Sequence, residues 1–104
     1  MKRKLILLFG RGLTVLLCGI TLANADEADS RGYMLASSCA ACHGPDGQSP
    51  GAIPSLYGKD KEYVATALKE FKSGERSATV MNRLAKGYSD DEIDIIAGWF
   101  AARK

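Results

Sequence analysis

The chain is short and its charge is nearly balanced. It has 104 residues, of which 14 are basic and 12 acidic, for a formal net charge of +2, and this length favours a single domain. All the acidic residues but only 10 of the basic ones lie in residues 26–104, so that part carries 10 positive against 12 negative charges, a net charge of −2. The basic bias belongs to the N-terminal segment, and nucleic-acid binding therefore loses its compositional support.

The first 25 residues have the pattern of a secretory signal peptide. A basic start precedes two apolar runs, and Ala23-Asn24-Ala25 forms a small-x-small cleavage site. Arg11 interrupts the apolar stretch and leaves it short for a membrane span, although an uncleaved anchor stays open as the alternative. We expect residues 1–25 to be removed and residues 26–104 to form a periplasmic domain that does not cross the membrane.

A first helix is expected from about Arg31 onward, capped by Asp29 or Ser30. Gly32 near its start has two interpretations. It either permits the close approach of another helix or is a glycine that the helix start tolerates. The helix leads into the run Cys39-Ala40-Ala41-Cys42-His43.

This run is a C-x-x-C-H motif, which is typical of covalent attachment of a c-type haem. Cys39 and Cys42 can each form a thioether to a porphyrin vinyl group, and His43 can supply its neutral imidazole as the proximal iron ligand. A zinc site needs four protein ligands, whereas residues 26–104 hold two cysteines and one histidine, so a zinc site would have to borrow a carboxylate, which is uncommon. A thioredoxin-type dithiol needs a βαβ context, and a plain disulfide would leave the adjacent histidine a coincidence. We therefore predict one covalent haem c.

The stretch 44–60 is dense in glycine and proline and is predicted to be a loop. A proximal histidine needs an acceptor for its second ring N–H, which fixes the tautomer. We expect the carbonyl of Pro54 to accept this hydrogen bond, and Ile53 and Leu56 to cover a haem face. Alternatively, Pro54 only stiffens a turn.

The rest of the chain predicts two longer helices and a short one. Asp60 can cap a helix through about Ser73, a short helical turn covers 80–86, and a capping box over 89–92 opens a last helix that runs to the C-terminus. The predicted buried stripes are Tyr63, Val64, Ala67, Leu68 and Phe71 in one helix, and Ile93, Ile96, Ala97 and Phe100, with Trp99 beside them, in the other. The fold class is therefore all-α, with three main helices and a short one around one haem.

Met81 is the candidate for the sixth iron ligand. His43 is the only histidine, and a methionine thioether is a common partner of histidine in c-type haems. Met1 leaves with the signal peptide, and Met34 lies close before Cys39 on the same helix, on the proximal side. The alternative is that Met81 fills the core and leaves an open iron, as in a haem sensor or a peroxidase.

These motifs together resemble the class I c-type cytochromes. The resemblance implies an all-α fold, a haem bound through Cys39 and Cys42, iron held by His43 and Met81, and one-electron transfer without catalysis by the domain itself. The matching stretches are Cys39-x-x-Cys42-His43-Gly44, Ile53-Pro54-x-Leu56-x-Gly58, Val80-Met81-x-x-Leu84-Ala85-Lys86-Gly87 and Ile96-Ala97-x-Trp99-Phe100.

A narrower resemblance is to the cytochrome subunit of flavocytochrome c sulfide dehydrogenase. It rests on Phe71-Lys72-Ser73-Gly74-Glu75-Arg76, Ala85-Lys86-Gly87-Tyr88 and Asp91-Glu92-Ile93. In that family a flavoprotein subunit oxidises sulfide at FAD and passes electrons to the cytochrome, which would make a flavoprotein the partner here. The better-known pattern has two haem domains, whereas this chain has one haem motif. The alternative is a free, diffusible c4-like or c553-like carrier that serves a terminal oxidase, a reductase or other redox proteins.

Overall fold

The computed structural model describes residues 24–104, and the chain divides into two compact units, residues 1–30 and 31–104. The predicted signal peptide, apart from its last two positions, lies outside the described residues. Of the first unit, residues 24–30 are helical and exposed. The helical conformation continues without a break to residue 37, so the prediction that Asp29 or Ser30 caps this helix is wrong. Residues 25–28 include two alanines and a glutamate, which favour helix ahead of the predicted cap.

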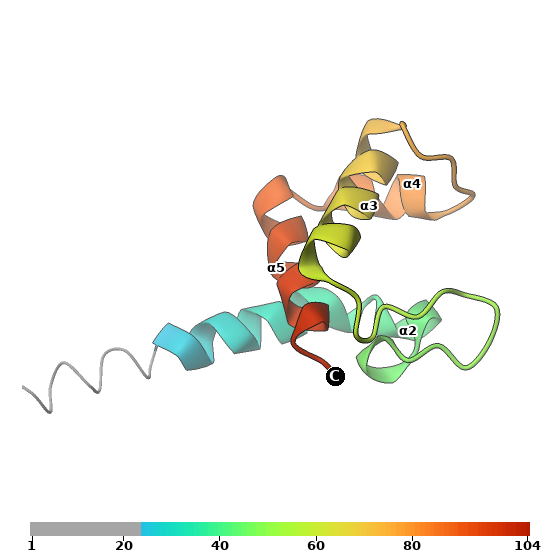
Figure 1. Cartoon of the computed structure of the whole chain (residues 1–104). Helices are drawn as coiled ribbons and strands as arrows, with labels where there is room; N and C mark the ends of the chain where they lie inside the picture. The colour runs from blue at the N-terminus through green and yellow to red at the C-terminus, as the bar shows by residue number, and fades with distance from the viewer. Residues whose placement is uncertain (1–23) are drawn as a thin grey trace, which may run out of the picture. The chain divides into compact units, whose positions relative to one another are not determined.

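The second unit is built of helices joined by turns and loops (Figure 1). The described residues contain no strand, so the all-α prediction is confirmed. None of their helices has the length and apolar character needed to cross a bilayer. In chain order the elements are the helical residues 31–37, α2 (Ala40–His43), the 3₁₀ turn η1 (Pro45–Gly47), α3 (Lys61–Ser73), α4 (Met81–Leu84), the 3₁₀ turn η2 (Ala85–Gly87) and α5 (Asp90–Ala101).

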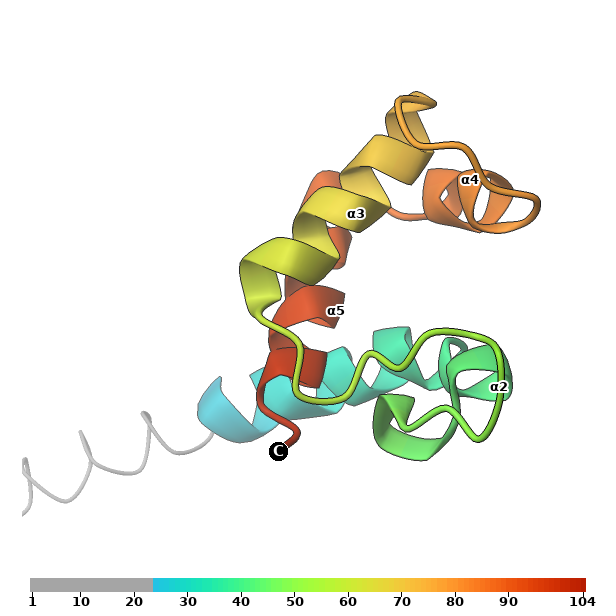
Figure 2. The ribbon, with the colours of Figure 1, turned by 45° about the vertical axis from the view of Figure 1, so that its right-hand side comes forward.

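Helices α3 and α5 lie side by side and run in opposite directions (Figure 2). The predicted bounds of α3 are confirmed. Asp60 occupies the position before its first turn, but its side chain makes no capping hydrogen bond. Gly74 ends the helix with a φ of 89°, and its N–H donates to the carbonyl of Glu70. A left-handed residue at this place suits glycine because it has no Cβ.

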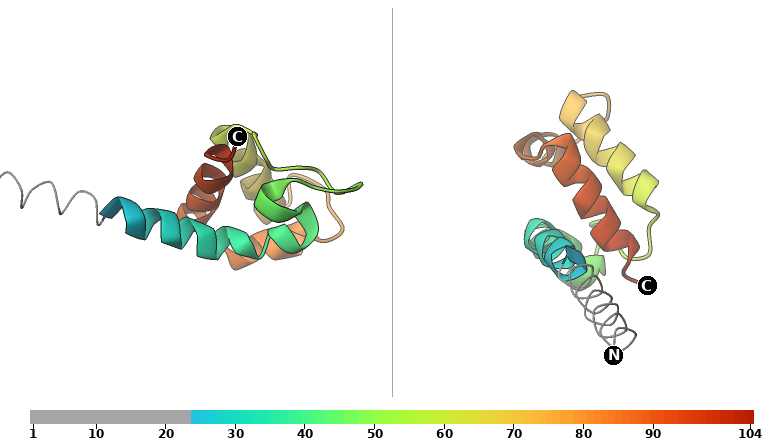
Figure 3. Two further views of the ribbon diagram at one scale, coloured as in Figure 1. Left: turned by 90° about the horizontal axis from the view of Figure 1, so that it is seen from below. Right: turned by 90° about the vertical axis from the view of Figure 1, so that its left-hand side faces the viewer.

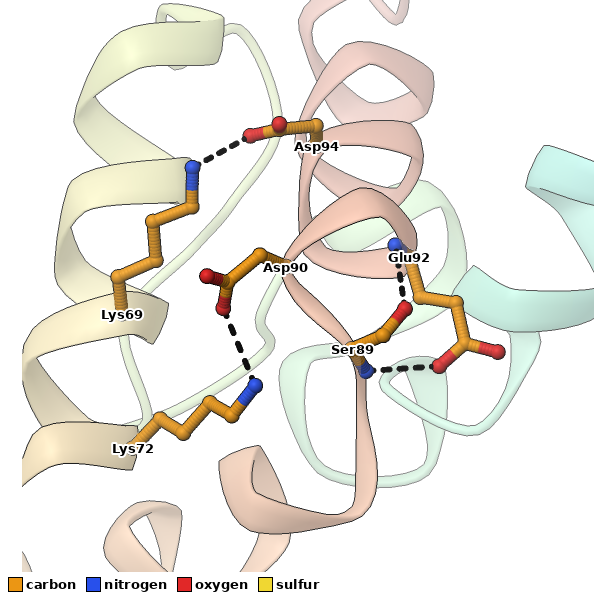
Figure 4. A network of polar contacts seen from close by, with 6 residues as sticks. All are labelled: Lys69, Lys72, Ser89, Asp90, Glu92 and Asp94. Atoms are coloured by element: carbon orange, nitrogen blue, oxygen red, sulfur yellow. Dashed lines mark hydrogen bonds and ion pairs between the residues drawn. The ribbon is translucent and has the colours of Figure 1, made fainter.

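The predicted capping box at the start of α5 is also confirmed (Figure 4). The N–H of Glu92 donates to Ser89 Oγ at 3.1 Å, and the N–H of Ser89 donates to Glu92 Oε2 at 2.9 Å. Two exposed ion pairs join α5 to α3, and exposed pairs of this kind contribute little to stability. They are Lys69–Asp94 at 2.9 Å and Lys72–Asp90 at 3.1 Å.

The core lies along one face of α5, as the spacing of its apolar residues predicts. Its buried residues are Ile93, Ile96, Ala97, Trp99 and Phe100, and those of α3 are Val64 and Ala65. The prediction that Tyr63 is buried is wrong, since 55% of the residue is exposed. It lies in the first turn of α3, where the ammonium of Lys59 lies 5.6 Å from the centre of its ring. That contact suits an aromatic face open to solvent.

The helical residues 31–37 lie beside α5 (Figure 3), and Gly32 marks the contact. A Cβ added at Gly32 would lie 2.8 Å from Trp99 Cδ1, which is closer than real Cβ atoms come. Of the two interpretations of Gly32, the structure therefore supports close approach of another helix. The ring of Tyr33 also faces Trp99, with ring centres 6.2 Å apart.

Candidate haem site

The C-x-x-C-H motif forms one tight helical turn. Cys39 occupies the position before α2 with helical backbone angles, and the N–H of His43 donates to its carbonyl at 2.9 Å. Residues three apart on a helix are neighbours on one face, so the turn brings Cys39 and Cys42 together. Both are free cysteines; Cys39 is half-buried and Cys42 is exposed. His43 is the last residue of the same turn.

Two glycines shape the backbone after the motif. Gly44 has a φ of 86°, and a Cβ at this position would collide with the backbone of Gln48. Gly47 has a φ of 80°, and its carbonyl accepts from the N–H of Leu56 at 2.8 Å and from that of Tyr57 at 3.2 Å. These contacts fold the loop after residue 47 back toward the helix that carries His43.

The loop places an acceptor on the imidazole of His43. His43 Nδ1 lies 2.5 Å from the carbonyl oxygen of Pro54. A carbonyl oxygen only accepts, so Nδ1 carries the proton and donates, and Nε2 is left with its lone pair. The predicted hydrogen bond is therefore confirmed. It gives His43 the tautomer and the fixed ring that a metal-ligating histidine needs.

The surroundings of the two thiols test two alternatives to haem attachment, a redox dithiol and a zinc site. Burial raises the pKa of the Cys39 thiol, which keeps it protonated at neutral pH, whereas a redox dithiol works through a thiolate of lowered pKa. Among residues 24–104, no three histidine, cysteine, aspartate or glutamate side chains gather in a group that could hold a metal ion. The turn thus presents two free thiols beside an oriented imidazole.

Met81, the predicted sixth ligand, is the first residue of α4 and is half-buried. Helices α4 and α2 lie on the same side of the α3–α5 pair, toward its opposite ends (Figures 1 and 2). Met34, the methionine that the sequence excludes, is 73% exposed on the helical residues 31–37. The structure therefore places the elements that carry His43 and Met81 on one side of the helix pair.

Apolar side chains are exposed in the two segments that the sequence assigns to the haem. Ile53 in the loop is 44% exposed, and Val80 and Leu84 around α4 are 53% and 50% exposed. Leu56 is half-buried and packs on the core cluster of α5. Within the described residues, Asn82 Oδ1 is buried without a hydrogen-bond partner. Exposed apolar side chains, with an unpartnered buried polar atom in the residue after Met81, fit a site for a largely apolar cofactor with polar substituents.

Sequence reasoning missed three residues around this site. Gly47 shapes the loop, but a loop rich in glycine carries no signal that separates this glycine from the others. Ser38 and Tyr88 form a hydrogen bond, with oxygen atoms 2.9 Å apart. They are 50 positions apart, and no local pattern pairs residues at such a separation.

Comparison with known proteins identifies the family. The model of the cytochrome c family matches residues 30–100, and the chain belongs to this family. The class I resemblance of the sequence is thereby confirmed, and the role that the family defines is electron transfer through a covalently bound haem c.

Within this family, individual proteins show which members the chain resembles. The cytochrome subunit of sulfide dehydrogenase from Chlorobaculum tepidum is 57% identical over 72 residues, covering 69% of this chain and 66% of the relative. Cytochrome c4 from Pseudomonas aeruginosa is 37% identical over 93 residues, covering 88% of this chain and 45% of the relative. The chain therefore spans less than two thirds of the length of these relatives. The structure of Acidithiobacillus ferrooxidans cytochrome c4 matches with a TM-score of 0.65 at 28% identity, covering 72% of this chain and 49% of that one.

Proposed function

We propose that this domain is a periplasmic electron carrier whose haem is attached through Cys39 and Cys42 and whose iron is held by His43 and Met81. The observation that carries the proposal is the hydrogen bond from His43 Nδ1 to Pro54, next to the paired thiols. The haem supplies an iron that changes oxidation state by one electron. Pro54, through its carbonyl, and Leu56, through its apolar side chain, complete the proposed binding residues. The signal-peptide pattern of residues 1–25 supports export.

Two protein ligands suit an electron carrier because they leave no position for a substrate. The thioether of Met81 and the imidazole of His43 would hold the iron together, and histidine with methionine is a common ligand pair in such haems. The position of α4 on the same side of the helix pair as α2 supports this assignment. The apolar side chains of Val80 and Leu84 beside Met81 would keep water from the iron.

Replacement of Met81 tests the ligation. In Met81→Ala we expect the long-wavelength sulfur-to-iron absorption band of the oxidised protein to disappear, because this band requires the thioether on the iron. Met34→Ala is the matched control, since it removes an exposed methionine, and it should keep the band. A spectrum of Met81→Ala identical to that of the unmodified protein would overturn the assignment and favour an open iron, as in a sensor or a peroxidase.

For the partner, we propose the FAD subunit of a sulfide dehydrogenase. The support is the relative named as the cytochrome subunit of such an enzyme, at 57% identity. In this role the domain accepts electrons that the flavin takes from sulfide, one at a time, and does not itself act on sulfide. The alternative is a free, diffusible carrier, which the similarity to cytochrome c4 favours.

Isolation from the native periplasm separates the two partner hypotheses. The tagged, haem-loaded protein would be captured under mild conditions, and the eluate assayed for flavin. A stoichiometric FAD protein that reduces the haem when sulfide is added would establish the subunit. If the protein elutes alone and sulfide leaves its haem oxidised, the subunit hypothesis is rejected in favour of a free carrier.

A further inference from the structure

The hydrogen bond between Ser38 and Tyr88 joins two segments that each carry part of the proposed site. Ser38 immediately precedes Cys39, and Tyr88 immediately follows η2, which continues directly from the α4 helix of Met81. The hydroxyl oxygens of Ser38 and Tyr88 lie 2.9 Å apart. This contact, the Ser38–Tyr88 bridge, ties the attachment segment to the end of the segment that carries the proposed sixth ligand.

The bridge is anchored firmly on the side of Tyr88. The Tyr88 ring packs against both buried core clusters, and the Tyr88 N–H donates to the carbonyl of Ala85 at 3.3 Å. Ala85 itself is fully buried. Because packing already holds the ring, its hydroxyl makes the hydrogen bond with little further loss of side-chain entropy.

The bridge is also held on the side of Ser38. The Ser38 hydroxyl lies 3.4 Å from the carbonyl of Leu35, within the helical residues 31–37. Beyond the bridge, α4 and η2 pack against α3, so their other support comes from a helix outside the attachment segment. The bridge is thus a direct tie between residues next to Cys39 and the chain that follows Met81.

We propose that Ser38 and Tyr88 are positioning residues that keep Met81 on the haem iron. This inference rests on the proposed ligation by Met81. In this proposal the 81–88 segment opens as one unit and breaks the bridge, so the Ser38–Tyr88 hydrogen bond stabilises the closed state relative to the open one. With Met81 held at the haem, His43 and Met81 would hold the iron in both oxidation states, and the bridge would support electron transfer by keeping Met81 in place.

Competition by imidazole measures the opening directly. Free imidazole takes the sixth position of the oxidised, haem-loaded protein only when Met81 has left it, so its apparent affinity reports the open fraction. Tyr88→Phe and Ser38→Ala each delete the bridge. Each should raise the affinity for imidazole by about fivefold, the effect of one hydrogen bond of ordinary net strength. The double variant should gain no more than either single one.

Matched controls separate the bridge from a general loss of stability. Ser37→Ala removes the neighbouring hydroxyl, which donates to the carbonyl of Met34, and Tyr33→Phe removes the hydroxyl of an exposed tyrosine on the same helix. Both should bind imidazole as the unmodified protein does. The proposal is overturned if the bridge variants match the unmodified protein, if the controls shift equally, or if the double variant multiplies the two single effects.

The unmodified protein shows separately whether the proposed function has failed. Absence of its sulfur-to-iron band would reject Met81 as ligand, and the role of the bridge with it, before any variant is made. If the band is present and imidazole affinity is unchanged in Tyr88→Phe and Ser38→Ala, the ligation stands and only the bridge is rejected.

Discussion

Gly47 should be essential to the stability of this domain, and Gly47→Ala tests the way the loop is seated on α5. At a φ of 80°, a residue with a Cβ is strained by about 1–2 kcal/mol. The new Cβ would also lie 3.0 Å from Leu56 and from the ring of Phe100. Overpacking of this kind costs about 1–3 kcal/mol. Alanine restricts the unfolded chain and returns about 0.4–1 kcal/mol, so the net loss should be about 1–5 kcal/mol.

Urea unfolding of the haem-loaded protein, followed by far-ultraviolet circular dichroism, measures this loss. With a denaturant slope of about 2 kcal/mol per M, the centre of the range for small proteins, the midpoint should fall by about 0.5–2.5 M. Gly51→Ala is the matched control in the same loop, because a Cβ there meets nothing within 4 Å, and its midpoint should not fall. A midpoint for Gly47→Ala equal to that of Gly51→Ala would refute the reasoning.

Two further predictions concern the α3–α5 pair. Ser89→Ala removes the acceptor for the Glu92 N–H and should cost about 1 kcal/mol, seen by calorimetry as a fall in Tm of about 4–8 °C; an unchanged Tm would show that the cap is dispensable. The hydrogen bond from Lys69 to Asp94 raises the pKa of Lys69 above its ordinary value of 10.5, so its stabilisation is complete below that pH and is lost as pH rises through the raised pKa. The free energy of unfolding of the unmodified protein and of Lys69→Met should be measured as a function of pH. The difference in favour of the unmodified protein should shrink above about pH 10.5, and a difference that does not change with pH would contradict this.

Several features of this protein depend on residues that are near one another in the chain. The sequence predicts these features. The bounds of α3 follow from apolar spacing and from Gly74, and the start of α5 follows from the box of Ser89 and Glu92. The C-x-x-C-H motif is one turn of helix whose chemistry is local. The hydrogen bond from His43 to Pro54 was also predictable, because a metal-ligating histidine needs an acceptor for its second ring N–H and Pro54 lies only 11 positions away.

Other features were decided by the tertiary structure, because they depend on which surfaces meet. Helical spacing assigns Tyr63 to the apolar stripe of α3. Only the packing of α3 on α5 determines which edge of that stripe stays exposed, and Tyr63 lies on the exposed edge. Gly32 is required by the ring of Trp99, which comes from the other end of the chain. The Ser38–Tyr88 bridge spans 50 positions. Such contacts exist only after the helices have packed, because packing sets which residues distant in sequence come within reach.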